Sequence, residues 1–257
     1  MTWRGLTRIT SIRLAVAVFL LGAAVTLAYR PFSQTVRGDC GIYDYIAQSI
    51  LRGELPYRDV IDPKAPVSMY LSALAMGIGR AVGVDDVIAV RWLYVLMAGL
   101  LSAITYLTAE AYLRNRLTAV IACLILFIPA NFVSMLTKGT QPKLPMMIFG
   151  MLALLLVAKD RPFWAGFCSM LSCLCWQPGL LFGGAAFLIF SRYLTSWRDW
   201  RPVKVVAGAT VPLAVVLLYF YSRGALSELW SWTITYAYSV FRPEGQKPVG
   251  QALTQIW

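Results

Sequence analysis

Long apolar segments separated by short charged ones constrain the fold of this chain more than any other feature. Of its 257 residues, 59% are hydrophobic, whereas soluble domains are usually about 45–50% apolar. About 20 apolar residues span a bilayer as a helix, and shorter segments need their flanking residues or a thinner bilayer. The pattern predicts an all-α polytopic membrane protein with seven spans: Leu14–Tyr29, Trp92–Leu113, Leu117–Leu136, Leu144–Ala158, Pro162–Trp176, Gly179–Phe190 and Val205–Tyr221.

The cations decide how a further short apolar run, Pro66–Ile78, is treated. If this run lies along the membrane surface, the basic stretch from Arg192 to Lys204 falls on the same side as the basic N-terminus. If the run crosses, that stretch faces the other side. Cytoplasmic loops carry an excess of Lys and Arg, so we expect a surface helix and a cytoplasmic N-terminus. We expect a multi-pass protein in the inner membrane of a bacterial cell.

A polar segment, residues 30–64, follows the first apolar run. It holds five of the twelve carboxylates of the chain: Asp39, Asp44, Glu54, Asp59 and Asp62. The predicted topology places it in an outer loop of residues 30–91, with juxtamembrane helices near Tyr43–Leu51 and Pro66–Ile78. The loop Ser134–Lys143 faces the same compartment, so a site composed of both loops is expected. Acids and cations gathered beside a membrane indicate chemistry at its surface.

Several classes of function are excluded by what the sequence lacks. The chain has no histidine, which removes His-based triads and His-ligated zinc. Four of the five cysteines lie in apolar runs, and only Cys40 lies in the polar segment, so we expect no disulfide framework. The net charge of +11 is attributed to cytoplasmic loops rather than to nucleic-acid binding. We expect no nucleic-acid partner, no cofactor and no metal site.

The polar segment has the spacing D-x3-Y-x3-A, then G-x2-PY-x-D, then DPK-x-P, beginning at Asp39 and ending at Pro66. This series resembles the first outer loop of the GT-C membrane glycosyltransferases. It is most similar to the branch of protein O-mannosyltransferase-like enzymes that use polyprenyl- or dolichyl-phosphate sugars. The resemblance covers roughly residues 2–221 and implies a GT-C-like helical bundle. It predicts one transmembrane module over residues 1–257, in which residues 222–257 form an outer-side tail that begins a missing C-terminal part.

The resemblance implies that Asp39 is the catalytic carboxylate, which takes the proton of the acceptor hydroxyl while the sugar leaves its lipid phosphate with inversion. A positioned general base suits a poor nucleophile such as a sugar hydroxyl. Lys64 resembles the lysine that meets the lipid phosphate. Asp44 competes with Asp39 as the base, while a helix N-cap remains an alternative for Asp39 and membrane snorkelling one for Lys64. Further substrate contacts are expected from Tyr43, Asp44, Tyr57, Arg58, Asp59 and Gln141.

The second outer loop departs from the family pattern. The family places an acid before a proline there, whereas this chain has Gln141 before Pro142. No second carboxylate is therefore available to share the proton transfer. Two cations in this loop, Lys138 and Lys143, are candidates to bind the donor phosphate, with ordinary solvated loop charges as the alternative reading. The chain has no D-x-D motif, and donors with a single phosphate favour a metal-free site.

The predicted function is transfer of a sugar, mannose or a related hexose, from a polyprenyl-phosphate donor to the hydroxyl of a glycan, lipid or protein acceptor at the outer or lumenal face. Membrane lipids are the other expected partners. The alternative is a catalytically inactive or truncated GT-C-like protein that binds a lipid-linked sugar or a partner subunit. The missing second-loop acid favours that alternative. A transporter is disfavoured because Glu110, near the end of a span, is the one acid in the predicted spans.

Overall fold

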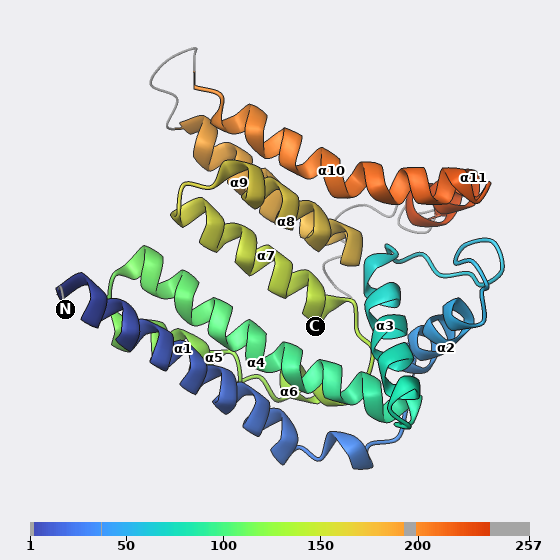
Figure 1. Cartoon of the computed structure of the whole chain (residues 1–257), viewed down its shortest axis with the longest axis horizontal. Coiled ribbons are helices and arrows are strands. Elements are labelled where there is room, and N and C mark those ends of the chain that lie inside the picture. The colour runs from blue at the N-terminus through green and yellow to red at the C-terminus, as the bar shows by residue number, and fades with distance from the viewer. Residues whose placement is uncertain (1–2, 37, 193–198, 237–257) are drawn as a thin grey trace, which may run out of the picture.

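The computed structural model describes residues 3–36, 38–192 and 199–236, and these residues contain helices and no strands. The long helices run side by side, and two shorter ones lie across one end of the bundle, hereafter the α2–α3 end (Figure 1). The bundle contains α1 (Trp3–Ala28), α4 (Asp86–Leu113), α5 (Arg116–Ile125), α6 (Ala130–Thr137), α7 (Lys143–Ala158), α8 (Pro162–Cys175), α9 (Leu180–Arg192) and α10 (Arg201–Ser222). The α2–α3 end carries α2 (Asp39–Leu51), α3 (Val67–Ala81) and α11 (Leu226–Trp230), and one-turn helices occupy Pro31–Ser33, Gln177–Gly179 and Ser231–Tyr236.

The lengths of the helices support a membrane protein with three or four spanning helices. Within the described residues, Thr10–Ser33, Asp86–Leu113 and Arg201–Ser222 are long and apolar enough to cross a bilayer. The 16 residues of α7 and the 14 of α8 rise about 1.5 Å each, less than the ~30 Å of a hydrocarbon core. The α9 helix has 13 residues. Helices therefore occur at all seven predicted positions, but seven complete spans are not established.

The third predicted span, Leu117–Leu136, is not one continuous helix. It consists of α5 and α6, whose axes differ by 73° across a short break. Pro129 lies at the break, where its φ of −72° and ψ of 109° place it outside the helix. Proline has no N–H to donate and disfavours helical backbone in the residue before it. The pair is either one broken span or a re-entrant segment.

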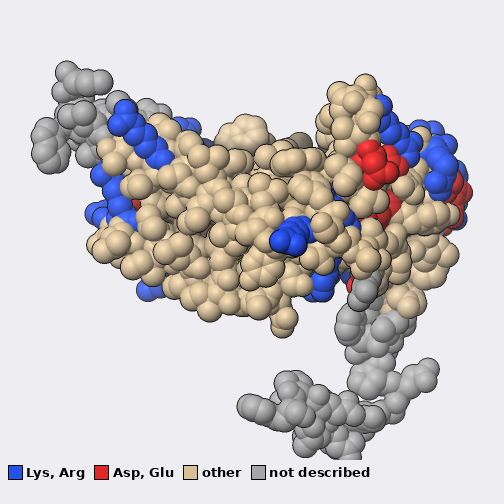
Figure 2. Space-filling view, turned by 90° about the horizontal axis from the view of Figure 1, so that it is seen from below, with Lys and Arg blue, Asp and Glu red and all other residues tan. Residues whose placement is uncertain are grey.

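Both helices expected in the first loop are present. The run Pro66–Ile78 forms most of α3, and the other helix, α2, begins at Asp39, four residues before the predicted start at Tyr43. Charged side chains gather toward the two ends of the molecule, with a largely uncharged surface between them (Figure 2). That distribution matches a helical bundle whose middle faces lipid.

The backbones of α8 and α10 touch at two glycines. A Cβ added to Gly166 would lie 1.9 Å from the carbonyl oxygen of Val205, and one added to Gly208 would lie 1.9 Å from that of Phe163. Only hydrogen atoms fit at these positions. Small residues at helix contacts are the usual way for membrane helices to gain packing energy, because lipid offers no hydrophobic driving force between helices.

We predict that Gly208→Ala lowers the thermal unfolding temperature of the purified protein in detergent. The added methyl group overlaps backbone atoms of α8, and overpacking of this kind costs about 1–3 kcal/mol. Gly184→Ala is the matched control, because no atom lies within 4 Å of a Cβ added to this helical glycine. The control is expected to keep or slightly raise the unfolding temperature, since Ala is the better helix former. Equal behaviour of the two variants would contradict the packing described for α8 and α10.

Candidate functional site

Asp39 is the first residue of α2, and its side chain is exposed. The cap position before it belongs to Gly38, whose φ of 59° lies in the region that favours glycine, and no side chain caps the helix there. Asp39 is thus not the N-cap residue that the sequence allowed as an alternative. Its carboxylate remains accessible and lies at the positive end of the α2 dipole.

The turn before α3 brings a second acid and a lysine close to Asp39. The buried carboxylate of Asp62 accepts a hydrogen bond from the backbone N–H of Lys64, at 2.7 Å. Burial raises the pKa of Asp62, the charge of Asp39 raises it further, and Lys64 opposes the rise. Burial likewise raises the pKa of the Tyr43 phenol, with contributions from both acids. Asp62 therefore interacts electrostatically with Asp39, Tyr43 and Lys64.

The loop before α7 reaches the same place from the other side. The side-chain amide of Gln141 donates a hydrogen bond to the Cys40 sulfur, at 3.0 Å. Burial raises the pKa of the Cys40 thiol, while Lys138 lowers it and Asp39 raises it. The exposed Lys138 and the exposed Asp39 thus both act on one buried thiol. The two loops predicted to form a composite site do contact each other.

The second acid of α2 has a different environment. The Asp44 side chain is buried, and its Oδ1 accepts a hydrogen bond from the Thr140 hydroxyl at 2.5 Å. The same hydroxyl lies 2.9 Å from the hydroxyl of Ser72 on α3. Burial raises the pKa of Asp44, and the hydrogen bonds from Thr140 and the charge of Arg91 oppose the rise. Asp44 is therefore enclosed by protein, whereas Asp39 is exposed.

Two side chains of α4, one helical turn apart, hold the segments that lead into this region. The Tyr94 hydroxyl accepts a hydrogen bond from the backbone N–H of Gln141 at 2.7 Å and donates one to its carbonyl at 2.9 Å. Arg91 donates to the carbonyl oxygen of Gln34, in the segment before α2. Residues at i and i+3 share a helix face, so one face of α4 supports both loops.

The turn of residues 55–60 is fixed to α10. Tyr57 has a φ of 74°, and its buried ring packs against Phe220 with 5.4 Å between ring centroids. Its hydroxyl donates to the carbonyl of Lys64 at 2.7 Å. Arg58 pairs with Asp59 at 3.1 Å and reaches the carbonyl of Arg223. Tyr57 thus supports the backbone of Lys64, whereas Arg58 and Asp59 contact each other and face α10.

The α8–α9 junction lies beside the turn that carries Lys64. Gln177 donates hydrogen bonds to the carbonyls of Pro63 at 2.8 Å and of Thr233 at 3.3 Å. Its neighbour Trp176 presents its ring to the ammonium group of Lys143, which lies 5.5 Å from the ring centroid. Lys143 is exposed, and this cation–π contact points it toward α8.

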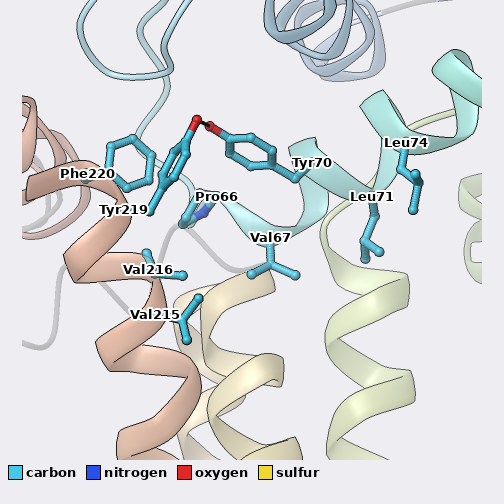
Figure 3. A pocket seen from close by; sticks show the side chains of 9 residues that line it. All are labelled: Pro66, Val67, Tyr70, Leu71, Leu74, Val215, Val216, Tyr219 and Phe220. Carbon is cyan, nitrogen blue, oxygen red and sulfur yellow. Dashed lines mark hydrogen bonds between the residues drawn. The ribbon is translucent and has the colours of Figure 1, made fainter. Parts of the chain in front are cut away.

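Two apolar grooves begin at Pro66, two residues after Lys64. The first has a volume of about 380 Å³ and lies between α3 and α10, where Val67 faces Val215 and Val216, and Leu71 and Leu74 extend the lining along α3 (Figure 3). The hydroxyls of Tyr70 and Tyr219 meet across one end of it, 3.2 Å apart. The second, of about 280 Å³, lies among α8, α9, α10 and α11 and includes Ala65, Gln177 and Val216 in its lining. An amphiphile could place its tail in either groove.

The arrangement suits an amphiphilic ligand with an anionic head group. An exposed acid and two lysines stand at the same end of the bundle as the two grooves. No group of three or more Cys, Asp or Glu side chains that could hold a metal occurs within residues 3–36, 38–192 and 199–236. Sequence reasoning missed the supporting residues because they are single polar side chains at the edges of apolar runs: Ser72, Arg91, Tyr94, Thr140 and Gln177.

We predict that Asp44 makes the stability of the fold depend on pH. Because its folded pKa is raised, the folded state binds the proton more tightly than the unfolded state, whose aspartates titrate near 3.9. The contribution of Asp44 is therefore present at low pH and is lost as pH rises through the raised folded value. Asp44→Asn cannot titrate, so the unfolding temperature of the variant should rise relative to that of the wild type as pH increases above the unfolded value near 3.9. Thermal unfolding in detergent at increasing pH measures the difference, and a gain by the wild type would contradict the burial of the carboxylate.

Comparison with known proteins adds nothing to this description: no protein-family model, no curated protein and no solved structure matches the chain.

Proposed function

We propose that this protein is a membrane glycosyltransferase of the GT-C type. One observation carries the proposal: the exposed carboxylate of Asp39 lies with Lys64 and Lys138 at the end of the bundle where two apolar grooves open. A polyprenyl-phosphate sugar has the matching chemistry, with an apolar tail, a phosphate that requires cations and a sugar that requires a base. The resemblance of the segment from Asp39 to Pro66 to the first outer loop of these enzymes supports the same assignment.

The donor lipid would occupy the second groove. Ala65 and Gln177 line that groove, and Gln177 also bonds the backbone beside Lys64. A tail in the groove would therefore bring its phosphate toward Lys64, and Lys138 would be the second cation of the site. Negative charge grows on the phosphate as the sugar leaves, and fixed cations stabilise that charge. The sugar would be mannose or a related hexose.

Asp39 would act as the general base. The acceptor hydroxyl attacks the anomeric carbon, the bond between that carbon and the phosphate oxygen breaks, and the configuration inverts. Asp39 takes the hydroxyl proton, and the phosphate leaves with the bonding electron pair. Because Asp39 is exposed, an acceptor can reach it, which the enclosed Asp44 does not allow. A positioned base contributes about 10²–10⁴-fold to rates of this kind.

The proposed topology has seven crossings, with α5 and α6 together making one. The short helices α7, α8 and α9 would require a locally thinned bilayer or their flanking residues. The N-terminus would be cytoplasmic and the α2–α3 end external, because the end opposite α2 and α3 carries the cations between spans. In a bacterial cell the site would then face outward across the inner membrane.

A second candidate is an inactive relative that binds a lipid-linked sugar or a partner subunit. Gln141 is the observation that favours it. The side-chain amide of Gln141 is bonded to Cys40, and its backbone is bonded to Tyr94. The position at which related enzymes carry a second acid therefore serves here to join the two loops. Transfer of sugar is the property that separates the candidates.

We predict that membranes carrying the wild-type chain transfer radiolabelled sugar from a polyprenyl-phosphate donor, and that Asp39→Asn loses about 10²-fold or more of that rate. Glu54→Gln is the matched control, since Glu54 belongs to the same segment and forms an exposed ion pair with the nearby Arg52. The control should retain wild-type activity. Absence of transfer by the wild type from mannosyl, glucosyl and galactosyl donors would favour the inactive candidate.

We predict opposite accessibility for two exposed positions, one at each end of the bundle. In a variant with its native cysteines replaced by alanine, Ile61→Cys should react with a membrane-impermeant maleimide on intact cells. Lys159→Cys should react only after the cells are opened. Both side chains are exposed, so burial does not limit either reaction. Labelling of position 159 but not 61 on intact cells would reverse the proposed orientation.

A further inference from the structure

We infer that Asp44, Thr140 and Ser72 form a hydrogen-bonded cluster, hereafter the latch, that positions Lys138 in the same region as Asp39. The latch joins α2, α3 and the loop before α7 through one hydroxyl group. Its role in catalysis rests on the proposed function, but its existence does not. Asp44 is thereby a positioning residue, although the sequence also allowed it as a base or a substrate contact.

The Thr140 hydroxyl is the centre of the latch. The Thr140 residue is fully buried, and its hydroxyl lies 2.5 Å from Asp44 Oδ1 and 2.9 Å from the Ser72 hydroxyl. A buried hydroxyl or carboxylate without a partner is costly, so each of these groups stabilises the position of the others. The three residues come from segments far apart in the sequence. Loss of the hydroxyl would leave Asp44 and Ser72 without this shared partner.

Gly139 shows how tightly the loop lies against α2. Its φ is +116°, and a Cβ added to it would lie 3.4 Å from Asp44 Oδ2 and 3.9 Å from Cys40 Cβ. The backbone that immediately follows Lys138 therefore touches α2 on the Asp44 side. Thr140 is fixed by Asp44 and Gln141 by Tyr94, so the loop has two successive anchors. Lys138 is exposed, and the anchored backbone of Gly139, Thr140 and Gln141 follows it directly.

The two acids of α2 have separate tasks because they lie on different faces of the helix. They are five positions apart, a rotation of about 140° at 3.6 residues per turn. Asp39 faces solvent at the start of α2, where it acts on Cys40 together with Lys138. Asp44 faces inward, and its Oδ2 has no hydrogen-bond partner within the described part of the chain. A base that must receive a proton from an acceptor needs the first environment.

A disulfide tests the latch without any assay of activity. The added Cβ at Gly139 lies 3.9 Å from Cys40 Cβ, within the roughly 3.5–4.5 Å found in disulfides. Gly139→Cys should therefore cross-link to the native Cys40 under mild oxidation, with the other four cysteines replaced by alanine and the product identified by mass spectrometry. Because the positive φ strains Cys at position 139, Gln141→Cys provides a second position to test against Cys40, whose sulfur the native Gln141 side chain reaches at 3.0 Å.

Substitutions at Thr140 decide the outcome. In either cysteine pair, Thr140→Val should slow cross-linking several-fold, and Thr140→Ser should restore it. Thr137→Val is the matched control, because Thr137 is also buried but bonds only the Ser134 carbonyl within α6. The control should cross-link as the parent does. Equal rates for Thr140→Val and the parent in both pairs would overturn the latch.

A double-mutant cycle tests the positioning of Lys138. Thr140→Val and Lys138→Gln should each raise the KM for polyprenyl-phosphate mannose by about tenfold, the value of one charge-assisted hydrogen bond, with little change in kcat. Together they should raise the KM no further, because both remove the same contact. Additive effects, or a loss confined to kcat, would overturn the positioning role. If the wild type transfers no sugar, the proposed function fails while the cross-link still decides whether the latch exists.

Discussion

Polar groups enclosed at one end of an apolar helical bundle must bond to one another, and the candidate site depends on this constraint. Water is scarce among the packed helices, so an unpaired backbone or side-chain group there costs several kcal/mol. The segments before α2 and α7 are irregular and lie against α4. Arg91 and Tyr94 of α4 supply their partners. The bonds that satisfy these loops also bring Asp39 and Lys138 to one place.

The α10 helix packs closely against α8 but leaves an apolar groove beside α3 that a lipid could occupy. Gly166 and Gly208 let the backbones of α8 and α10 touch. Between α3 and α10, by contrast, the Tyr70 and Tyr219 hydroxyls meet, and an apolar groove lined by Val67, Val215 and Val216 lies beside this contact (Figure 3).

The sequence predicted where helices occur better than it predicted whether each helix is continuous. Apolar runs bounded by charges located helices at all seven predicted span positions, and the short run Pro66–Ile78 was correctly taken as a separate helix, whereas α11 was not predicted. The break between α5 and α6 was missed, although Pro129 is visible in the sequence, because hydropathy sums over a window and does not register a single missing N–H. The roles of Asp44 and Thr140 could not be predicted, since residues 96 positions apart form one hydrogen bond.

The sequence by itself determined that this chain is a helical membrane protein with an acidic and basic segment beside its first span, because hydropathy and charge are properties of neighbouring residues. Tertiary structure alone decided which acid is exposed and which is enclosed. Asp39 and Asp44 lie on different faces of α2, and the packing of the loop before α7 decides which of the two faces is enclosed. Burial and hydrogen bonding depend on distant segments, so no local pattern encodes them.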